Sequence, residues 1–184
     1  MRNLLVFFAV MAIVLISCES NTKTVPEIVK KTVKASEGGT VTSEDGLASI
    51  NIPAGALEKD TEITVEKKSP SAYPDKEYLG SNIYDFGPDG LTFKKPAKLT
   101  IKATSTVSAQ DNKIIKMAVY KSSKNAWAYA GSGLEESGDP IMTVDASGDP
   151  IMSGDPIMSG DPIMSEVGHF SEYSVMVFDA ENSD

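Results

Sequence analysis

Apolar and polar residues alternate in several short runs along this chain, which is typical of half-buried β-strands. One such run is Ile50 and Ile52, another is Ile63 and Val65, and a third is Leu99 and Ile101, each with polar residues between its members. Further runs of the same kind lie at 40–42, 114–120 and 126–130. The pattern predicts an all-β protein in which each strand has one buried and one exposed face.

The stretch 84–101 carries the clearest turn and strand signals in the sequence. Gly87-Pro88-Asp89-Gly90 has the composition of a tight turn, because proline fixes one φ angle and glycine accepts positive φ. Leu91 and Phe93 then alternate with polar residues, and Leu99 and Ile101 do the same after Pro96. We expect two short strands here. The closing segment 166–178 is expected to be the last strand of the domain.

Three sequence features in this order resemble the ZU-five domain family. They are Gly38-Gly39 followed by Thr-Val, the run Ile-Asn-Ile-Pro-Ala-Gly-Ala-Leu at 50–57, and Gly-Pro-Asp-Gly-Leu-Thr-Phe-Lys-Lys-Pro at 87–96. The resemblance spans about residues 36–178 and implies a small β-sandwich used for contacts between proteins. Many short strands separated by Gly, Pro and Asp turns favour the same fold class independently.

The N-terminus has the pattern of a secretory signal. Arg2 supplies a positive start, and the apolar run 4–16 has 13 residues, which is short for a membrane-spanning helix and suits a signal-peptide core. Leu-Ile-Ser-Cys at 15–18 resembles a bacterial lipobox, which implies lipid attachment at Cys18, the single cysteine. Lipoprotein chemistry implies three acyl chains, such as palmitate, and several chains anchor durably where one does not.

These features divide the chain into four expected parts: a signal peptide at 1–17, a lipidated cysteine and flexible polar tether at 18–35, a β-sandwich at 36–178, and an acidic tail at 179–184. We expect a protein of the cell envelope, lipid-anchored to a bacterial membrane on the extracytoplasmic side. We expect no cofactor besides the covalent lipid. The formal net charge of −9 argues against nucleic acid as a partner, because phosphates require basic surfaces.

A hexapeptide, Ser-Gly-Asp-Pro-Ile-Met, occurs four times within 137–164, at 137–142, 147–152, 153–158 and 159–164. Three tandem copies are too few to bury the core of a β-helix, so we expect an expanded loop in which one copy serves as turn and strand and the others expose Ile and Met. The repeats also allow a calcium hypothesis, because carboxylates suit Ca²⁺. Its ligands would be Asp139, Asp149, Asp155 and Asp161.

The closing segment holds His169, the single histidine, followed by Phe170 and Ser171. One histidine cannot build a transition-metal site, and no Gly-x-Ser-x-Gly motif is present for a hydrolase. In death-domain scaffold relatives of the ZU-five module, a His-Phe-Ser tripeptide cuts itself between Phe and Ser. We favour the alternative, in which His169 and Ser171 share one face of a strand and Phe170 packs on the other.

Three functions therefore remain open. The favoured one is a non-catalytic protein-interaction or surface-binding module, since no catalytic cluster is evident. The second is a self-cleaving module that uses His169, Phe170 and Ser171. The third is a calcium- or carbohydrate-binding module, for which Tyr73, Tyr78 and Tyr84 are the candidate exposed aromatics. We expect Trp127 to be a core or cross-strand residue.

Overall fold

The computed structural model describes residues 28–130, 132–140, 142–152 and 154–179. The strands are β1 (Ile28–Val33), β2 (Gly39–Thr42), β3 (Ala48–Ile52), β4 (Thr61–Lys68), β5 (Ile83–Gly87), β6 (Thr92–Lys102), β7 (Lys113–Lys121), β8 (Ala126–Ala128), β9 (Pro162–His169) and β10 (Glu172–Asp179). Three short 3₁₀ turns are η1 (Pro70–Ala72), η2 (Lys76–Tyr78) and η3 (Ala109–Asp111). Within these ranges, no helix is long and apolar enough to cross a membrane.

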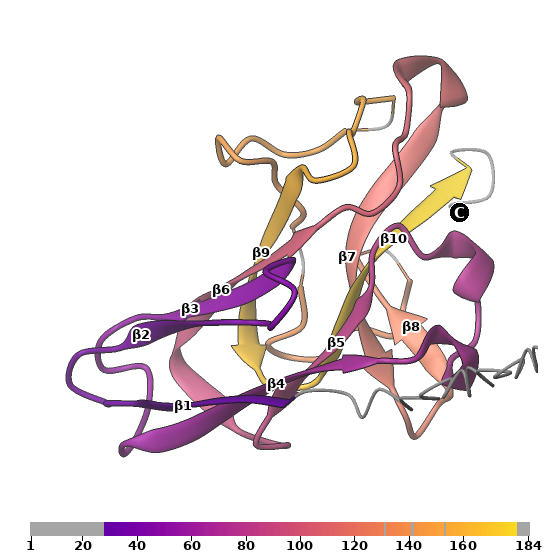
Figure 1. Cartoon of the computed structure of the whole chain (residues 1–184). Helices are drawn as coiled ribbons and strands as arrows, with labels where there is room; N and C mark the ends of the chain where they lie inside the picture. The colour runs from indigo at the N-terminus through magenta and orange to yellow at the C-terminus, as the bar shows by residue number, and fades with distance from the viewer. Residues whose placement is uncertain (1–27, 131, 141, 153, 180–184) are drawn as a thin grey trace, which may run out of the picture.

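The strands form two antiparallel sheets (Figure 1). One sheet has six strands in the order β1-β4-β5-β10-β7-β8, and the other has four in the order β2-β3-β6-β9. The inward side chains of both sheets make one core, which includes Ile50, Ile63, Leu99, Ile101 and Val175. These residues are buried because they occupy alternate strand positions that face the opposing sheet. The predicted all-β sandwich is confirmed.

The sheet begins earlier than expected. Residues 28–33 were assigned to a flexible tether, but they form β1, which pairs along its length with β4 from Ile28↔Glu66 to Val33↔Thr61. Val33 is 1% exposed and belongs to the core. The tether prediction is therefore wrong for 28–33, because an edge strand with one neighbour buries few side chains and gives little alternation in sequence. Residues 18–27 of that tether, and Cys18 with the signal peptide, lie outside the described residues.

The stretch 91–101 is one strand rather than two. β6 runs through Pro96, and its register against β9 shifts between Thr92 and Ala97. Proline cannot donate to a ladder, so it is tolerated at such an irregularity. The preceding turn has Gly90 at φ +72°, as its composition predicts, and the Gly87–Pro88 peptide bond is cis.

The closing segment 166–178 is not one strand. It is divided between β9 and β10, which are consecutive in the chain and lie in different sheets (Figure 1). Phe170 and Ser171 are the two residues between them. The Phe170 side chain is 3% exposed and packs in the core, whereas Ser171 is half-buried. β10 ends at Asp179, the first residue of the expected acidic tail, and the rest of the tail lies outside the described residues.

The repeat region is a folded loop over β9 rather than a free bulge. The last copy enters β9 at Pro162, as expected of one copy. Ile163 of this copy is 0% exposed, as expected of a strand residue, but Ile157 of the preceding copy is also buried, at 6% exposed, which corrects the expectation that the extra copies expose their isoleucines. The methionines of three copies do point outward: Met142 is 56%, Met152 65% and Met158 60% exposed.

Candidate functional site

Two turns that are distant in sequence meet at one end of the sandwich. The β5–β6 turn carries Leu91, whose carbonyl oxygen accepts the Phe170 amide at 2.9 Å, and Phe86 of β5 donates its amide to the Ser171 carbonyl at 3.0 Å. Both residues of the crossing, Phe170 and Ser171, are thus hydrogen-bonded to the stretch 84–101. We call this meeting point the turn junction.

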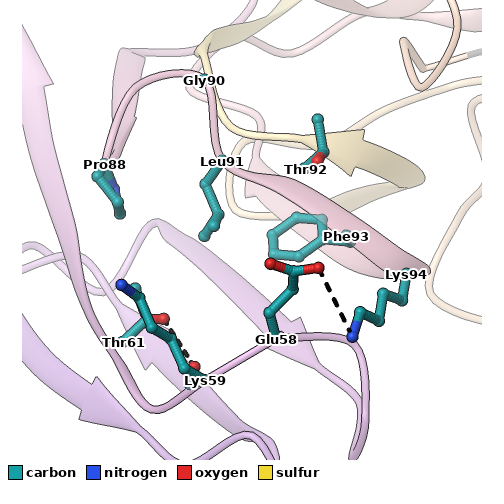
Figure 2. Close-up of a pocket in the computed structure, with 9 residues that line it drawn as sticks. All are labelled: Glu58, Lys59, Thr61, Pro88, Gly90, Leu91, Thr92, Phe93 and Lys94. Atoms are coloured by element: carbon teal, nitrogen blue, oxygen red, sulfur yellow. Dashed lines mark hydrogen bonds and ion pairs between the residues drawn. The ribbon is translucent and has the colours of Figure 1, made fainter.

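A pocket of about 310 Å³ opens on one side of the turn junction (Figure 2). Leu91 and Phe93 supply its apolar wall, and both are half-buried. Figure 2 shows their side chains directed toward the segment that carries Glu58 and Thr61. The remaining lining residues are Lys59, Pro88, Gly90, Thr92 and Lys94.

The rim of this pocket is charged and exposed to solvent. Lys94 Nζ lies 3.7 Å from Glu58 Oε1, and the two side chains are 56% and 81% exposed. A pair this exposed contributes little to stability, so both groups are available to a partner at small cost. An apolar wall with a charged rim is the usual composition of a protein-contact site.

Aromatic packing joins the pocket to the buried crossing. The Phe93 ring contacts the Phe170 ring edge to face at 4.9 Å, and the Phe170 ring stacks on Phe86 at 6.2 Å. A chain of three rings therefore runs from the pocket wall into the core, and Phe170 is the central one.

His169 sits beside the crossing in a buried charged network. Its Nε2 lies 2.8 Å from Asp139 Oδ1. Lys121 Nζ donates to the same carboxylate oxygen at 2.8 Å, and the Glu136 amide donates to Oδ2 at 2.8 Å. The side chains of Asp139 and Lys121 are 0% and 10% exposed. We call Asp139, Lys121 and His169 the buried triad.

The charges of the buried triad follow from its contacts. Burial alone raises the pKa of Asp139, but the hydrogen bonds from Lys121, the Glu136 amide and His169 outweigh it and hold that pKa below its usual value. Lys121 is the reverse case, because burial lowers its pKa and the bonds to Asp139 and Glu136 raise it above normal. Asp139 is thus an anion, and His169 donates to it through Nε2–H.

The other imidazole nitrogen faces the crossing. His169 Nδ1 lies 3.2 Å from the Phe170 carbonyl oxygen and 3.5 Å from the Tyr173 hydroxyl. Tyr173 donates its hydroxyl to the His169 carbonyl at 2.8 Å, and burial with the nearby Asp139 charge raises the pKa of Tyr173, so this hydroxyl stays protonated. A neutral imidazole presents a basic lone pair at Nδ1, and a doubly protonated one presents a donor to the Phe170 carbonyl.

These positions correct one sequence interpretation. His169, Phe170 and Ser171 do not alternate on a strand, because β9 ends at His169 and β10 begins at Glu172. The backbones at Gly168 and Gly138 pack closely, because a Cβ added to Gly168 would lie 2.7 Å from the Gly138 Cα. This close approach brings Asp139 beside His169. The role of Asp139 was missed because its contacts with Lys121 and His169 depend on tertiary structure.

The four repeat aspartates have different surroundings. Asp155 and Asp161 accept the amides of Met152 and Met158, at 2.6 and 2.8 Å, and so close turns. Asp149 donates its amide to Asp145. Only the first copy places its aspartate in the buried triad. Among the described residues, no group of three or more His, Cys, Asp or Glu side chains has an arrangement that could hold a metal ion.

The tyrosines proposed as exposed ligand-binding aromatics differ in their exposure. Tyr84 was expected to be exposed, but it is 0% exposed, and its hydroxyl donates to Asp45 at 2.8 Å. Both faces of β5 are covered, which explains the difference. Tyr73 is half-buried and Tyr78 is 37% exposed. Trp127 is 3% exposed and packs across strands with Tyr120, which confirms its predicted role.

Comparison with known proteins gives one family. A model of the ZU5 domain matches residues 30–122, which is half of the chain and includes β6, β7 and the pocket of Figure 2. The match ends before the repeats, so His169 and the crossing lie outside it. No curated protein matches the chain.

Proposed function

The chain belongs to the ZU5 domain family, and from this membership we propose that it is a lipid-anchored bacterial envelope protein whose β-sandwich binds another protein. The observation that carries the binding role is the pocket at the turn junction, because the family's own Gly-Pro-Asp-Gly turn and the strand after it build its wall. An apolar wall of Leu91 and Phe93 takes an apolar side chain of the partner, and the lysines at its rim favour neighbouring acidic groups.

The anchor is proposed from the sequence around Cys18. Removal of residues 1–17 and lipidation of Cys18 would leave nine residues, 19–27, between the lipid and β1. An extended segment of that length reaches about 30 Å, enough to hold the sandwich clear of headgroups. Replacement of Cys18 by serine tests this directly. The wild-type protein stays in the membrane fraction after carbonate washing, and the variant is released; retention of the variant would refute lipid anchoring.

Photo-crosslinking tests the binding site. Thr92 is exposed and lines the pocket, whereas Lys124 is exposed in the β7–β8 hairpin and is not among the residues that line it. A photoreactive benzoylphenylalanine is placed at each position in turn, and cells are irradiated. We expect one adduct of defined mass from position 92 and none of that mass from position 124. Equal labelling from both positions, or no labelling from position 92, would refute binding of the partner at this pocket.

We propose self-cleavage between Phe170 and Ser171 as a second candidate function. It is supported by His169 Nδ1, 3.2 Å from the carbonyl oxygen of the bond to be cut, with Asp139 fixing the opposite nitrogen. A polar hollow of about 400 Å³ lined by Ser171 and Glu172 gives water a route to the same bond.

The steps balance without any cofactor. His169 takes the Ser171 hydroxyl proton while Oγ attacks the Phe170 carbonyl carbon. The proton passes to the Ser171 nitrogen as the C–N bond breaks, which leaves an ester between Phe170 and the Ser171 hydroxyl. Water then hydrolyses the ester, and the products are a Phe170 carboxylate and a Ser171 N-terminus.

Intact-mass spectrometry under denaturing conditions separates the two functions. Cleavage releases residues 171–184, and Ser171→Ala abolishes the release. Asp139→Asn slows it by misorienting His169, whereas the matched Asp161→Asn, in the last repeat copy, leaves it unchanged. A single full-length mass for the wild-type chain would refute self-cleavage and leave the binding proposal intact.

A further inference from the structure

A second concave surface lies on the outer face of the six-stranded sheet, away from the turn junction. Four aromatic side chains line a groove of about 330 Å³: Tyr78 in η2, Trp127 in β8, Tyr129, and Phe178 in β10. The Phe178 ring lies 4.7 Å from Tyr129 and 5.4 Å from Tyr78, with tilts of 38° and 35°. We call this surface the aromatic groove.

Hydrogen bonds within the protein fix the shape of the aromatic groove. Trp127 Nε1 donates to the Pro74 carbonyl at 3.1 Å, which ties the groove's back wall to the loop that carries Asp75. Gly80 donates its amide to Val175 at 2.8 Å, so the same loop is bonded to β10. A rigid site of this kind loses little conformational entropy on binding.

The rings of Trp127, Tyr129 and Phe178 lie outside the main core. Trp127, Met176, Ile83 and Ala118 form a separate buried cluster, and Tyr129 and Phe178 pack on its outside. Tyr78 remains 37% exposed. The exposed part of Tyr78 and the half-buried rings of Tyr129 and Phe178 are therefore the aromatic surfaces available to a ligand.

Two carboxylates lie in the lining of the groove beside these rings. Asp75 and Asp179 line the groove, and Asp75 is exposed directly before η2. Burial raises the pKa of Tyr129, and the carboxylates of Asp75 and Glu135 raise it further, so their potential reaches the ring hydroxyl. Lys113 Nζ donates to the Asp179 carboxylate at 2.6 Å, which offsets part of that charge.

We propose that the aromatic groove takes an arginine side chain from a protein partner. This assignment rests on the proposed protein-binding function and adds the chemistry of the partner. A guanidinium stacks on aromatic faces and forms paired hydrogen bonds with a carboxylate, and the groove offers both within one lining. The net charge of −9 also draws a basic partner toward this surface.

The arginine comes from a different protein. The single arginine of the sequence is Arg2, inside the signal peptide that we expect to be removed. A second mature copy of the chain therefore has no guanidinium to offer. Neutral oligosaccharides would use the same rings but not the charge, so the experiment includes them as the competing outcome.

The single tryptophan makes the test direct, because Trp127 lines the groove and its fluorescence reports occupancy. The sandwich from residue 19 onward is titrated with acetyl-Gly-Arg-Gly-amide and with the same peptide containing citrulline, which keeps the shape and loses the charge. We expect a saturable change with the arginine peptide at about 1 mM and at least tenfold weaker binding of the citrulline peptide. Raising the salt to 0.5 M weakens arginine binding several-fold.

Variants separate the ring from the charge. Tyr78→Leu removes an exposed wall and weakens binding about fivefold, whereas Tyr78→Phe keeps the ring and binds within twofold of the wild type. Asp75→Asn weakens binding about threefold, and Asp89→Asn, the same charge change outside the groove lining, has no effect. Thermal unfolding confirms that each variant is folded.

Three results would overturn the assignment: equal binding of the arginine and citrulline peptides, a saturable response to cellohexaose without one to arginine, or no response to any ligand. None of these results affects the crosslink expected at position 92, so failure here is distinguishable from failure of the proposed binding function.

Discussion

Removal of the Asp139 carboxylate is the most informative perturbation of the fold. This side chain is 0% exposed and accepts hydrogen bonds from Lys121 and His169, each at 2.8 Å. Asp139→Ala leaves a nearly buried ammonium without its main partner, and breaking a buried ion pair on one side costs about 3–5 kcal/mol. Asp139→Asn keeps an acceptor for the Glu136 amide, so we expect a smaller loss of about 1.5–3 kcal/mol.

Asp161 is the matched control. It occupies the same position in the last repeat copy and accepts the Met158 amide at 2.8 Å, so Asp161→Ala removes a turn-closing bond alone. We expect a loss of about 1 kcal/mol, as for other side-chain caps. Urea unfolding at pH 7, followed by Trp127 fluorescence, measures all three variants.

The pH dependence gives a second readout of the same carboxylate. Its pKa is lowered in the folded protein, so its stabilisation is fully present above the unfolded value of about 3.9 and is lost as the pH falls through the folded value. The difference between wild type and Asp139→Asn therefore shrinks as the pH falls below about 4. If Asp139→Ala costs no more than Asp161→Ala at pH 7, the buried triad does not stabilise the fold.

Three further predictions concern other parts of the sandwich. Glu172 lies directly opposite Asp85 in the ladder, and burial followed by the nearby carboxylates raises its pKa, so Glu172→Gln should stabilise the fold by about 0.2–1 kcal/mol at pH 7. The gain should shrink as the pH falls through the raised folded pKa and be absent below the unfolded value of about 4.3. Urea unfolding at pH 7 and pH 4 checks this, and a loss of stability at pH 7 would contradict it. Gly168→Ala places a Cβ 2.7 Å from the Gly138 backbone and should cost at least about 1–3 kcal/mol, whereas an unchanged melting temperature would show that the two backbones separate easily. Met158→Ser should change stability by less than about 0.5 kcal/mol because the side chain is 60% exposed, and a larger loss would mean that this methionine is buried in solution.

The sequence predicts the fold class well because half-buried strands carry their own signal. Ile50, Ile63, Leu99 and Ile101 alternate with polar residues, and all four are 0% exposed in the core. β1 gave no such signal. It lies at a sheet edge and buries Val33 alone among its residues, so its composition is that of a solvated tether.

The site was less predictable because its geometry depends on long-range contacts. The break between β9 and β10 falls at Phe170 and Ser171, where neither glycine nor proline marks a turn, so the sequence around it resembles one strand. The four repeat copies are identical in sequence, yet the aspartate of the first copy alone meets Lys121 and His169. Identical local sequence cannot distinguish these copies, since the difference lies in what the rest of the fold brings beside them.

Crosslinking from position 92 in membranes, with and without Cys18, tests whether the protein is a lipid-anchored binding module. We expect one partner adduct in the membrane fraction of cells that carry the photoreactive residue with Cys18 intact. We also expect that Cys18→Ser releases the protein from that fraction and depletes the adduct there. Absence of any adduct with Cys18 intact, or an equal yield in the membrane fraction after Cys18→Ser, would contradict a lipid-anchored binding module.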